Sequence, residues 1–64
     1  MLKKNYLTEV QVALMIKRAV QTLRNDRFLR RGLPYVKFGR SVRYDEADVV
    51  EFMQNRKVNV ADDI

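Results

Sequence analysis

The sequence predicts a small, mostly helical domain with one β-hairpin, in the order helix, helix, hairpin, helix. Apolar residues recur at helical spacing up to residue 26 and again after residue 45, and between residues 33 and 44 they alternate at period two around a Gly-Arg turn. A chain of 64 residues with 47% apolar content is long enough for one hydrophobic core and too short for two domains. We assign residues 1–57 to this domain and expect a flexible acidic tail at residues 58–64.

The first helix is expected to follow a short basic lead at residues 1–5. Thr8 can cap it through its hydroxyl, and Gln11, three residues later, completes a capping box. The helix should run to about Ile16. Its inward stripe consists of Val12, Ala13 and Ile16 with Met15 at the margin, whereas Val10 and Leu14 lie one turn apart on a different face.

A second helix is predicted from about Ala19 to Asp26 or slightly beyond. It follows a turn at Lys17 and Arg18, where the apolar pattern changes phase, so the two helices form a helix-turn-helix arrangement. Leu23 faces inward. The side chains that face outward near the N-terminal end of this helix are natural base readers, and they are Val20, Gln21 and Arg24.

The segment 27–31 is open to three interpretations. It extends the second helix, forms a separate turn, or is a loop pinned by Phe28. Gly32 marks its end in each case, because glycine is the usual residue just past a helix. Leu33 and Pro34 then lead into the hairpin, where proline is tolerated at the beginning of a strand.

The hairpin is predicted to consist of two short strands on either side of Gly39 and Arg40. Gly39 can adopt the positive φ that a two-residue turn requires, which leaves Arg40 projecting from the tip. The alternation indicates that one face anchors the hairpin to the core and that the other is exposed. The core face is expected to carry Val36, Phe38, Val42 and Tyr44, and the exposed face Tyr35, Lys37 and Arg43.

The third helix is expected from Glu46 to about Arg56. Asp45 can cap it, and the acidic residues of its first turn favour the positive end of the helix dipole. Arg56 and Lys57 suit its C-terminal end for the converse reason. Its inward residues are expected to be Val49, Phe52 and Met53, with Val50 marginal.

Basic residues gather in the middle of the chain, although the net charge of the whole is only +5. The segment 17–43 holds nine basic residues and one acidic residue, hence a local charge of +8, which is typical of a polyanion-binding surface. Besides the base readers, we assign DNA contacts to Lys17 and Arg18 in the turn and to Lys37, Arg40, Ser41 and Arg43 in the hairpin. Further phosphate contacts are assigned to Thr22, Arg27, Arg30, Arg31 and Tyr35.

Several function classes are disfavoured by composition. The chain has no cysteine and no histidine, so we expect no metal site, no cofactor and no enzymatic activity. The carboxylates near the third helix, Asp45, Glu46, Asp48 and Glu51, lie on one helix without such partners. No apolar run approaches the roughly 20 residues that span a bilayer, and no signal segment is recognisable. We therefore expect a complete cytoplasmic chain, associated with the nucleoid when bound.

Several stretches carry a resemblance to a known family: Tyr6-Leu7-Thr8-Glu9, Ala13, Thr22-Leu23, the run from Leu33 to Tyr44, and Asp48-Val49 through Phe52. Over nearly the whole chain, they resemble the excisionase-like branch of the small winged helix-turn-helix proteins related to the MerR DNA-binding module. The resemblance implies that the second helix enters the major groove and that the hairpin is a wing on the backbone or in the adjacent minor groove. Gln21 and Arg24 would then lie near base edges, and Lys37, Arg40 and Arg43 near phosphates or in the minor groove.

The departures from this family lie in the turn and in the link after the second helix. Lys17 stands where relatives usually have glycine, Ala19 where they have a small hydroxyl residue, and Arg18 where they have an apolar one. A left-handed turn at Lys17 should therefore cost about 1 kcal/mol, and the second helix should lack its cap. The segment 27–31 is also longer than the usual link.

The resemblance further implies DNA bending and cooperation with a recombinase. We therefore predict an excisionase, or recombination directionality factor, that binds repeated double-stranded sites as adjacent copies and helps a cognate integrase, while being a monomer in solution. A small phage or mobile-element transcription regulator of the same fold remains the alternative. A third interpretation, from another class, is a basic protein-interaction module with Val10 and Leu14 as its partner surface.

Overall fold

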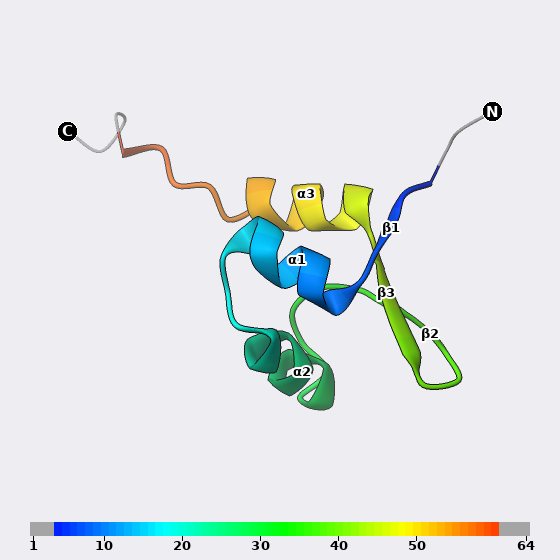
Figure 1. Ribbon diagram of the computed structural model, residues 1–64. Coiled ribbons are helices and arrows are strands. Elements are labelled where there is room, and N and C mark those ends of the chain that lie inside the picture. Colours follow the sequence, from blue (N-terminus) through cyan, green and yellow to red (C-terminus); the bar gives the residue numbers. More distant parts are fainter. Residues whose placement is uncertain (1–3, 61–64) are drawn as a thin grey trace.

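The computed structural model describes residues 4–60, a mixed α/β unit in which three helices accompany a three-stranded antiparallel sheet (Figure 1). The strand order is β1-β3-β2. Residues 61–64 of the predicted tail and residues 1–3 of the predicted lead lie outside this range. The elements are β1 (Tyr6–Leu7), α1 (Glu9–Ile16), α2 (Val20–Phe28), β2 (Val36–Phe38), β3 (Ser41–Asp45) and α3 (Glu46–Gln54).

The helix α1 begins and ends where the sequence predicts. Its capping box is complete, because the Gln11 amide donates to Thr8 Oγ1 at 3.2 Å and the Thr8 amide donates to Gln11 Oε1 at 2.9 Å. Lys17 ends the helix in the left-handed conformation, with φ 57°, and the next amide, that of Arg18, donates back to the Ala13 carbonyl at 2.9 Å. A side chain at such a position costs about 1 kcal/mol.

The helix α2 starts without a side-chain cap, as predicted, because Ala19 stands at its N-cap. It extends to Phe28, so the first interpretation of the segment 27–31 holds in part and the pinned loop is wrong. Past this end the chain reverses through Arg30, which has φ 56°, and the Arg31 amide donates to the Asp26 carbonyl at 2.9 Å. Both helices of the pair therefore end in a left-handed basic residue.

The strand β1 was not predicted. Tyr6 and Leu7 pair with the last two residues of β3, and just beyond them the Glu46 amide donates to the Asn5 carbonyl at 2.9 Å. The two residues between the predicted basic lead and the Thr8 cap therefore form an edge strand, which makes β3 the central strand of the sheet. An ion pair reinforces this edge, with Lys4 Nζ 3.0 Å from Asp45 Oδ2.

The hairpin of β2 and β3 forms with Gly39 (φ 61°) in its turn, but its register differs from the prediction. Phe38 pairs with Ser41, and Lys37 pairs with Val42. Cross-strand partners point to the same face of a sheet. Val42 therefore lies on the face of Lys37 and not on the face of Val36 and Phe38. The four apolar residues of the predicted core face therefore cannot share one side.

The prediction that Val36 and Phe38 anchor the hairpin is wrong: they are 44% and 58% exposed. They share the outer face with Arg43, whereas Lys37 and Tyr35, expected outside, lie on the side of the core residues. Tyr44 and Val42 do provide the anchor, the former fully buried and the latter packed against the core. One face of β3 alone therefore holds the hairpin to the helices.

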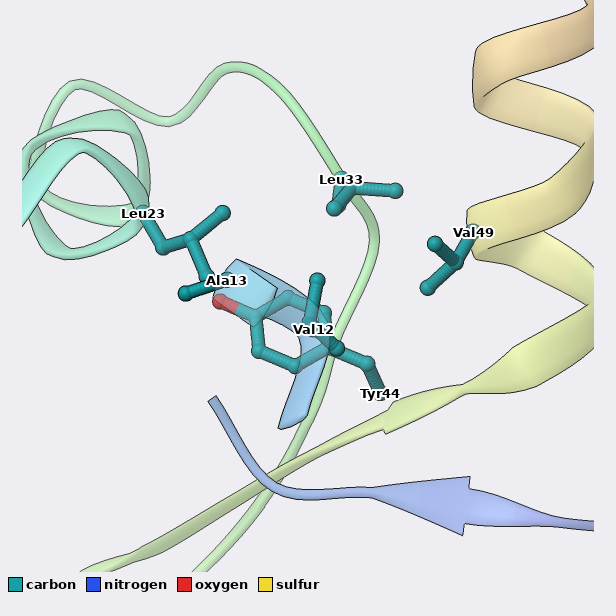
Figure 2. Close-up of a cluster of buried hydrophobic side chains, with 6 residues drawn as sticks. All are labelled: Val12, Ala13, Leu23, Leu33, Tyr44 and Val49. Atoms are coloured by element: carbon teal, nitrogen blue, oxygen red, sulfur yellow. The ribbon is translucent and has the colours of Figure 1, made fainter. Parts of the chain in front are cut away.

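The core lies between α1, α2, α3 and β3 (Figure 2). Leu33, for which no role was predicted, is one of its members. Val20 was expected to face outward but packs against the core, because it precedes Leu23 by three residues and shares its inward stripe. Met53 was expected inside but is 48% exposed, since Phe52 is the residue of that turn that packs inward. The buried residues are Val12, Ala13, Leu23, Leu33, Tyr44 and Val49.

The helix α3 is capped as predicted, because Asp45 Oδ1 accepts a hydrogen bond from the Ala47 amide at 3.0 Å. It ends at Gln54, two residues before the predicted Arg56. Arg56 does meet the C-terminal end of the helix as predicted, because its Nη1 donates to the Phe52 carbonyl at 3.2 Å and its guanidinium carbon lies 3.5 Å from the centroid of the Phe52 ring. In the described part of the chain, no helix is long and apolar enough to cross a membrane.

The missing cap of α2 gives a stability prediction. Ala19→Ser adds a hydroxyl that can accept an amide hydrogen bond of the first turn, so the free energy of unfolding should rise by about 1 kcal/mol. For a domain of this size, the melting temperature should rise by roughly 4–8 °C. Ala47→Ser is the matched control, because α3 already has its cap; it should give no increase in thermal unfolding experiments. An equal increase from both variants would contradict the assignment of Ala19 as the uncapped position.

Candidate nucleic-acid interface

The helix α2 and the tip of the hairpin lie on the same side of the molecule, away from α3 (Figure 1). A groove of about 500 Å³ separates them, and the first turn of α1 forms its third wall. Four arginines line this groove: Arg24 and Arg27 from α2, and Arg40 and Arg43 from the hairpin. The sequence assigned DNA or phosphate contacts to all four, and the fold brings them together with Ser41.

Glu9, the first residue of α1, joins two of these arginines. Arg24 Nη2 donates to Glu9 Oε2 at 2.7 Å, and Arg27 Nη2 donates to Glu9 Oε1 at 3.0 Å. Arg27 Nη1 also donates to the Tyr44 hydroxyl at 2.7 Å. The chain of contacts therefore ties α1, α2 and β3 to one another. Sequence reasoning missed Glu9 as a site residue, because an ion pair across 15 residues leaves no local pattern.

The contacts of this network favour the charged forms of Glu9, Arg24 and Arg27. The hydrogen bond from Arg24 lowers the pKa of the Glu9 carboxyl, against a smaller opposing effect of burial, and Arg27 lowers it further. Burial would lower the pKa of Arg27, but its bonds to Tyr44 and Glu9 raise that pKa overall. The pKa of Arg24 is raised by Glu9. One carboxylate therefore faces two guanidinium groups, and the network keeps a net positive charge.

The two arginines on Glu9 differ in exposure. The Arg27 side chain is 18% exposed and the Arg24 side chain 54%. The Arg27 guanidinium also lies 5.8 Å from the centroid of the Tyr35 ring, which in turn tilts against Tyr44 at a centroid distance of 6.4 Å. Arg27 is therefore held within the scaffold, whereas Arg24 reaches solvent at the mouth of the groove.

The outward face of α2 carries Gln21 and Arg24, as predicted, without Val20. It also carries two residues that the sequence analysis did not assign, Asn25 and Phe28. Gln21 Nε2 donates to Asn25 Oδ1 at 3.0 Å, which shows that these two side chains share a face. Residues three, four and seven positions apart on a helix lie along one stripe, so the spacing would have revealed all four once the helix was extended to Phe28.

The hairpin presents Lys37 and Arg40 to solvent, whereas Ser41 and Arg43 are half-buried. Arg43 Nη1 donates to the Val42 carbonyl at 2.8 Å, and its guanidinium lies 5.9 Å from the Phe38 ring centroid. The exposed cations of the hairpin are therefore Arg40, at its tip, and Lys37, which is separated from the turn by one residue of β2. These are the positions from which a side chain can reach a polyanion without breaking a contact of the fold.

The remaining predicted contacts lie outside the groove. Lys17 and Arg18 are exposed in the turn between α1 and α2, and Thr22 lines a small cleft near Phe52. Arg30, Arg31 and Tyr35 line a shallow depression beyond the end of α2, where Arg31 Nε is 3.1 Å from Asp26 Oδ1.

The apolar pair on α1 is exposed, as predicted. Val10 is 53% and Leu14 72% exposed. Val10 borders the arginine-lined groove, whereas Leu14 lies one turn further along the helix. Their role as a partner surface stays a prediction.

No protein-family model, no curated protein and no solved structure matches this chain. Among residues 4–60, no group of three or more histidine, cysteine, aspartate or glutamate side chains is placed to hold a metal ion. The groove is therefore interpreted from its own residues and their charges.

The Glu9 network predicts an acid-sensitive stability. Because the folded-state pKa of Glu9 lies below its ordinary value of 4.5, its stabilisation is complete above that value and is lost as the pH falls through the lowered pKa. Glu9→Gln should therefore be less stable than wild type at pH 7 and should lose less stability between pH 7 and pH 3 in urea unfolding. Some dependence should remain, because the Lys4 hydrogen bond also lowers the pKa of Asp45. Glu51→Gln, on the exposed side of α3, is the control and should keep the wild-type difference.

Proposed function

We propose that this protein is a winged helix-turn-helix protein that binds double-stranded DNA and acts as an excisionase, a recombination directionality factor that does no chemistry itself. In this proposal, α1 and α2 are the helix-turn-helix pair, and the hairpin of β2 and β3 is the wing. One observation carries it: arginines from α2 and from the hairpin line the same groove, on the side of the molecule away from α3. Two protruding cationic elements beside a groove fit the major groove of a duplex and its flanking backbone.

The two elements would have different tasks on DNA. The outer face of α2 offers Gln21 and Arg24, whose side chains can make paired hydrogen bonds with base edges. Arg40 at the tip of the wing is suited to a phosphate or to a narrow minor groove, where the negative potential is strongest. Phosphate contacts set position and affinity, whereas base contacts set sequence preference.

The proposed architectural role follows from holding the duplex at two places. A helix in one groove and a wing beside it can stabilise a bent duplex, with the cost of deformation offset by neutralised phosphates. Repeated bent sites, each with a copy of the protein, would give an integrase the DNA shape that excision requires. Transcription regulation by the same fold would use the same surface at a single operator.

Electrostatic binding predicts a steep dependence on salt. Neutralising about six to eight phosphates should give a slope of log K against log salt of about −5 to −7. Arg40→Ala should weaken duplex binding and reduce the slope by about 1, measured by fluorescence anisotropy at several salt concentrations. Lys57→Ala, an exposed cation past the end of α3, is the matched control and should leave both values unchanged. Unchanged duplex binding by the Arg40 variant would support the protein-interaction module instead.

Base contacts and backbone contacts should respond differently to mutation. Gln21→Ala or Arg24→Ala should reduce the preference for a selected duplex over random DNA, since each removes a reader of base edges. Lys37→Ala should weaken binding to both duplexes about equally. Competition assays with the two DNAs measure the ratio. If all three variants change affinity without changing the ratio, the division of tasks between α2 and the wing is wrong.

The biological role is tested by footprinting the DNA that flanks this gene, together with a bending assay. Several protected and bent repeats near an integrase attachment site would support the role in excision. Protection of a single promoter operator would support transcription regulation. The absence of any protected site would contradict both.

A further inference from the structure

Phe28 is exposed to an unusual degree. Its side chain is 86% exposed, the largest value among the large apolar residues in the described range. Single apolar residues on a surface are common, so exposure alone assigns no role. The position of Phe28 on α2 is more informative.

Phe28 lies on the outward stripe of α2. It follows Gln21 by seven residues, Arg24 by four and Asn25 by three, and these intervals place all four side chains on one face of a helix. We call these four residues the α2 outer stripe. The chain reverses directly after Phe28 through the left-handed Arg30, so the ring stands at the end of the stripe.

We propose that Phe28 reads a thymine by contacting its 5-methyl group in the major groove, so that the preferred DNA has a required thymine at the end of the α2 footprint. This inference rests on the proposed function. The thymine methyl is the apolar group that base pairs present in the major groove, and a phenyl ring has no donor or acceptor with which to read the polar positions there.

The rest of the α2 outer stripe fits the same kind of sequence. Gln21 and Asn25 suit adenine, through its N6 and N7 atoms, and Arg24 suits guanine, through O6 and N7. From Gln21 to Phe28, the helix rises about 10 Å, which corresponds to about three base-pair steps of 3.4 Å. The stripe therefore favours a short site with adenine towards the start of α2 and thymine about three base pairs away.

The surroundings of Phe28 favour DNA over a protein partner. A protein-binding patch needs contiguous apolar surface, but the flanking residues are mostly cationic. Leu29, which is 53% exposed, is the apolar neighbour in sequence, and the exposed Arg30 and Arg31 directly follow the pair. Positive charge around an apolar tip complements phosphates on either side of a base edge.

The test uses the whole protein and a duplex selected by it from a pool of short random sequences. The selected duplex is then made again with deoxyuridine in place of each thymidine in turn, which removes only the 5-methyl group. For the wild type, one such change should weaken binding about fourfold, the value expected for the loss of one buried methyl group. For Phe28→Ala, the same change should have no effect.

Two controls separate this effect from others. Phe38→Ala removes a second exposed phenylalanine, on the outer face of the hairpin, and should keep the fourfold penalty. The melting temperature of Phe28→Ala should equal that of wild type, because the ring is exposed. A penalty that persists in the Phe28 variant, or no penalty at any position for the wild type, overturns the inference and leaves the DNA-binding proposal intact.

Two further outcomes would also overturn the inference about Phe28. If Phe28→Ala binds DNA as the wild type does but changes the sedimentation of the protein, the residue belongs to a contact between copies of the chain, and the inference is overturned. If the wild type enriches no duplex and binds random DNA no more tightly than a neutral protein does, both the inference and the proposed function fail.

Discussion

The rest of the structure depends on the burial of Tyr44. Its ring is 1% exposed in the middle of the core, on the central strand, and its hydroxyl points towards α2 (Figure 2). A buried hydroxyl must be hydrogen-bonded, and Arg27 meets this need at 2.7 Å. The half-buried guanidinium then needs its own partner, which is Glu9 at 3.0 Å. The position of the groove is thus set by the core, because the same contacts that satisfy Tyr44 fix α1, α2 and β3 relative to one another.

This arrangement separates a structural arginine from one that can leave its partner. Breaking the contacts of Arg27 would leave a buried hydroxyl and a half-buried charge unsatisfied, which is expensive. The Arg24 side chain is 54% exposed, and an exposed ion pair contributes at most about 1 kcal/mol. In the proposed function, Arg24 can therefore exchange Glu9 for DNA while Arg27 keeps Glu9 in place. A DNA group would then have to compete with the Glu9 carboxylate for Arg24.

Local chemistry made much of the fold predictable, and long-range pairing accounts for the errors. The caps at Thr8 and Asp45 located two helices because capping is a local interaction. The β1 strand was not predicted because two residues are too few to show alternation. Phe38 was assigned to the wrong face because a two-residue turn pairs Val42 with Lys37, so that Phe38 points to the opposite side. The clustering of charge predicted a cationic surface, whereas the groove itself and the part of Glu9 in it were not predicted. Excisionase activity and the family resemblance stay predictions, because they concern partners that no contact within the chain reveals.

The four left-handed residues of the described chain bear on what the cations are for. Two are glycines, and at Gly32 a Cβ atom would come within 3.0 Å of Asp26, so a side chain there meets a second obstacle. The other two, Lys17 and Arg30, each cost about 1 kcal/mol relative to glycine, in a domain whose small core leaves little stability to spare. They close α1 and α2, on either side of the helix that carries the outer stripe. A cation at any other exposed position would increase solubility equally, without the cost of a left-handed backbone. Solubility therefore does not explain the positions of Lys17 and Arg30, and in the proposed function both cations flank the helix that meets the DNA.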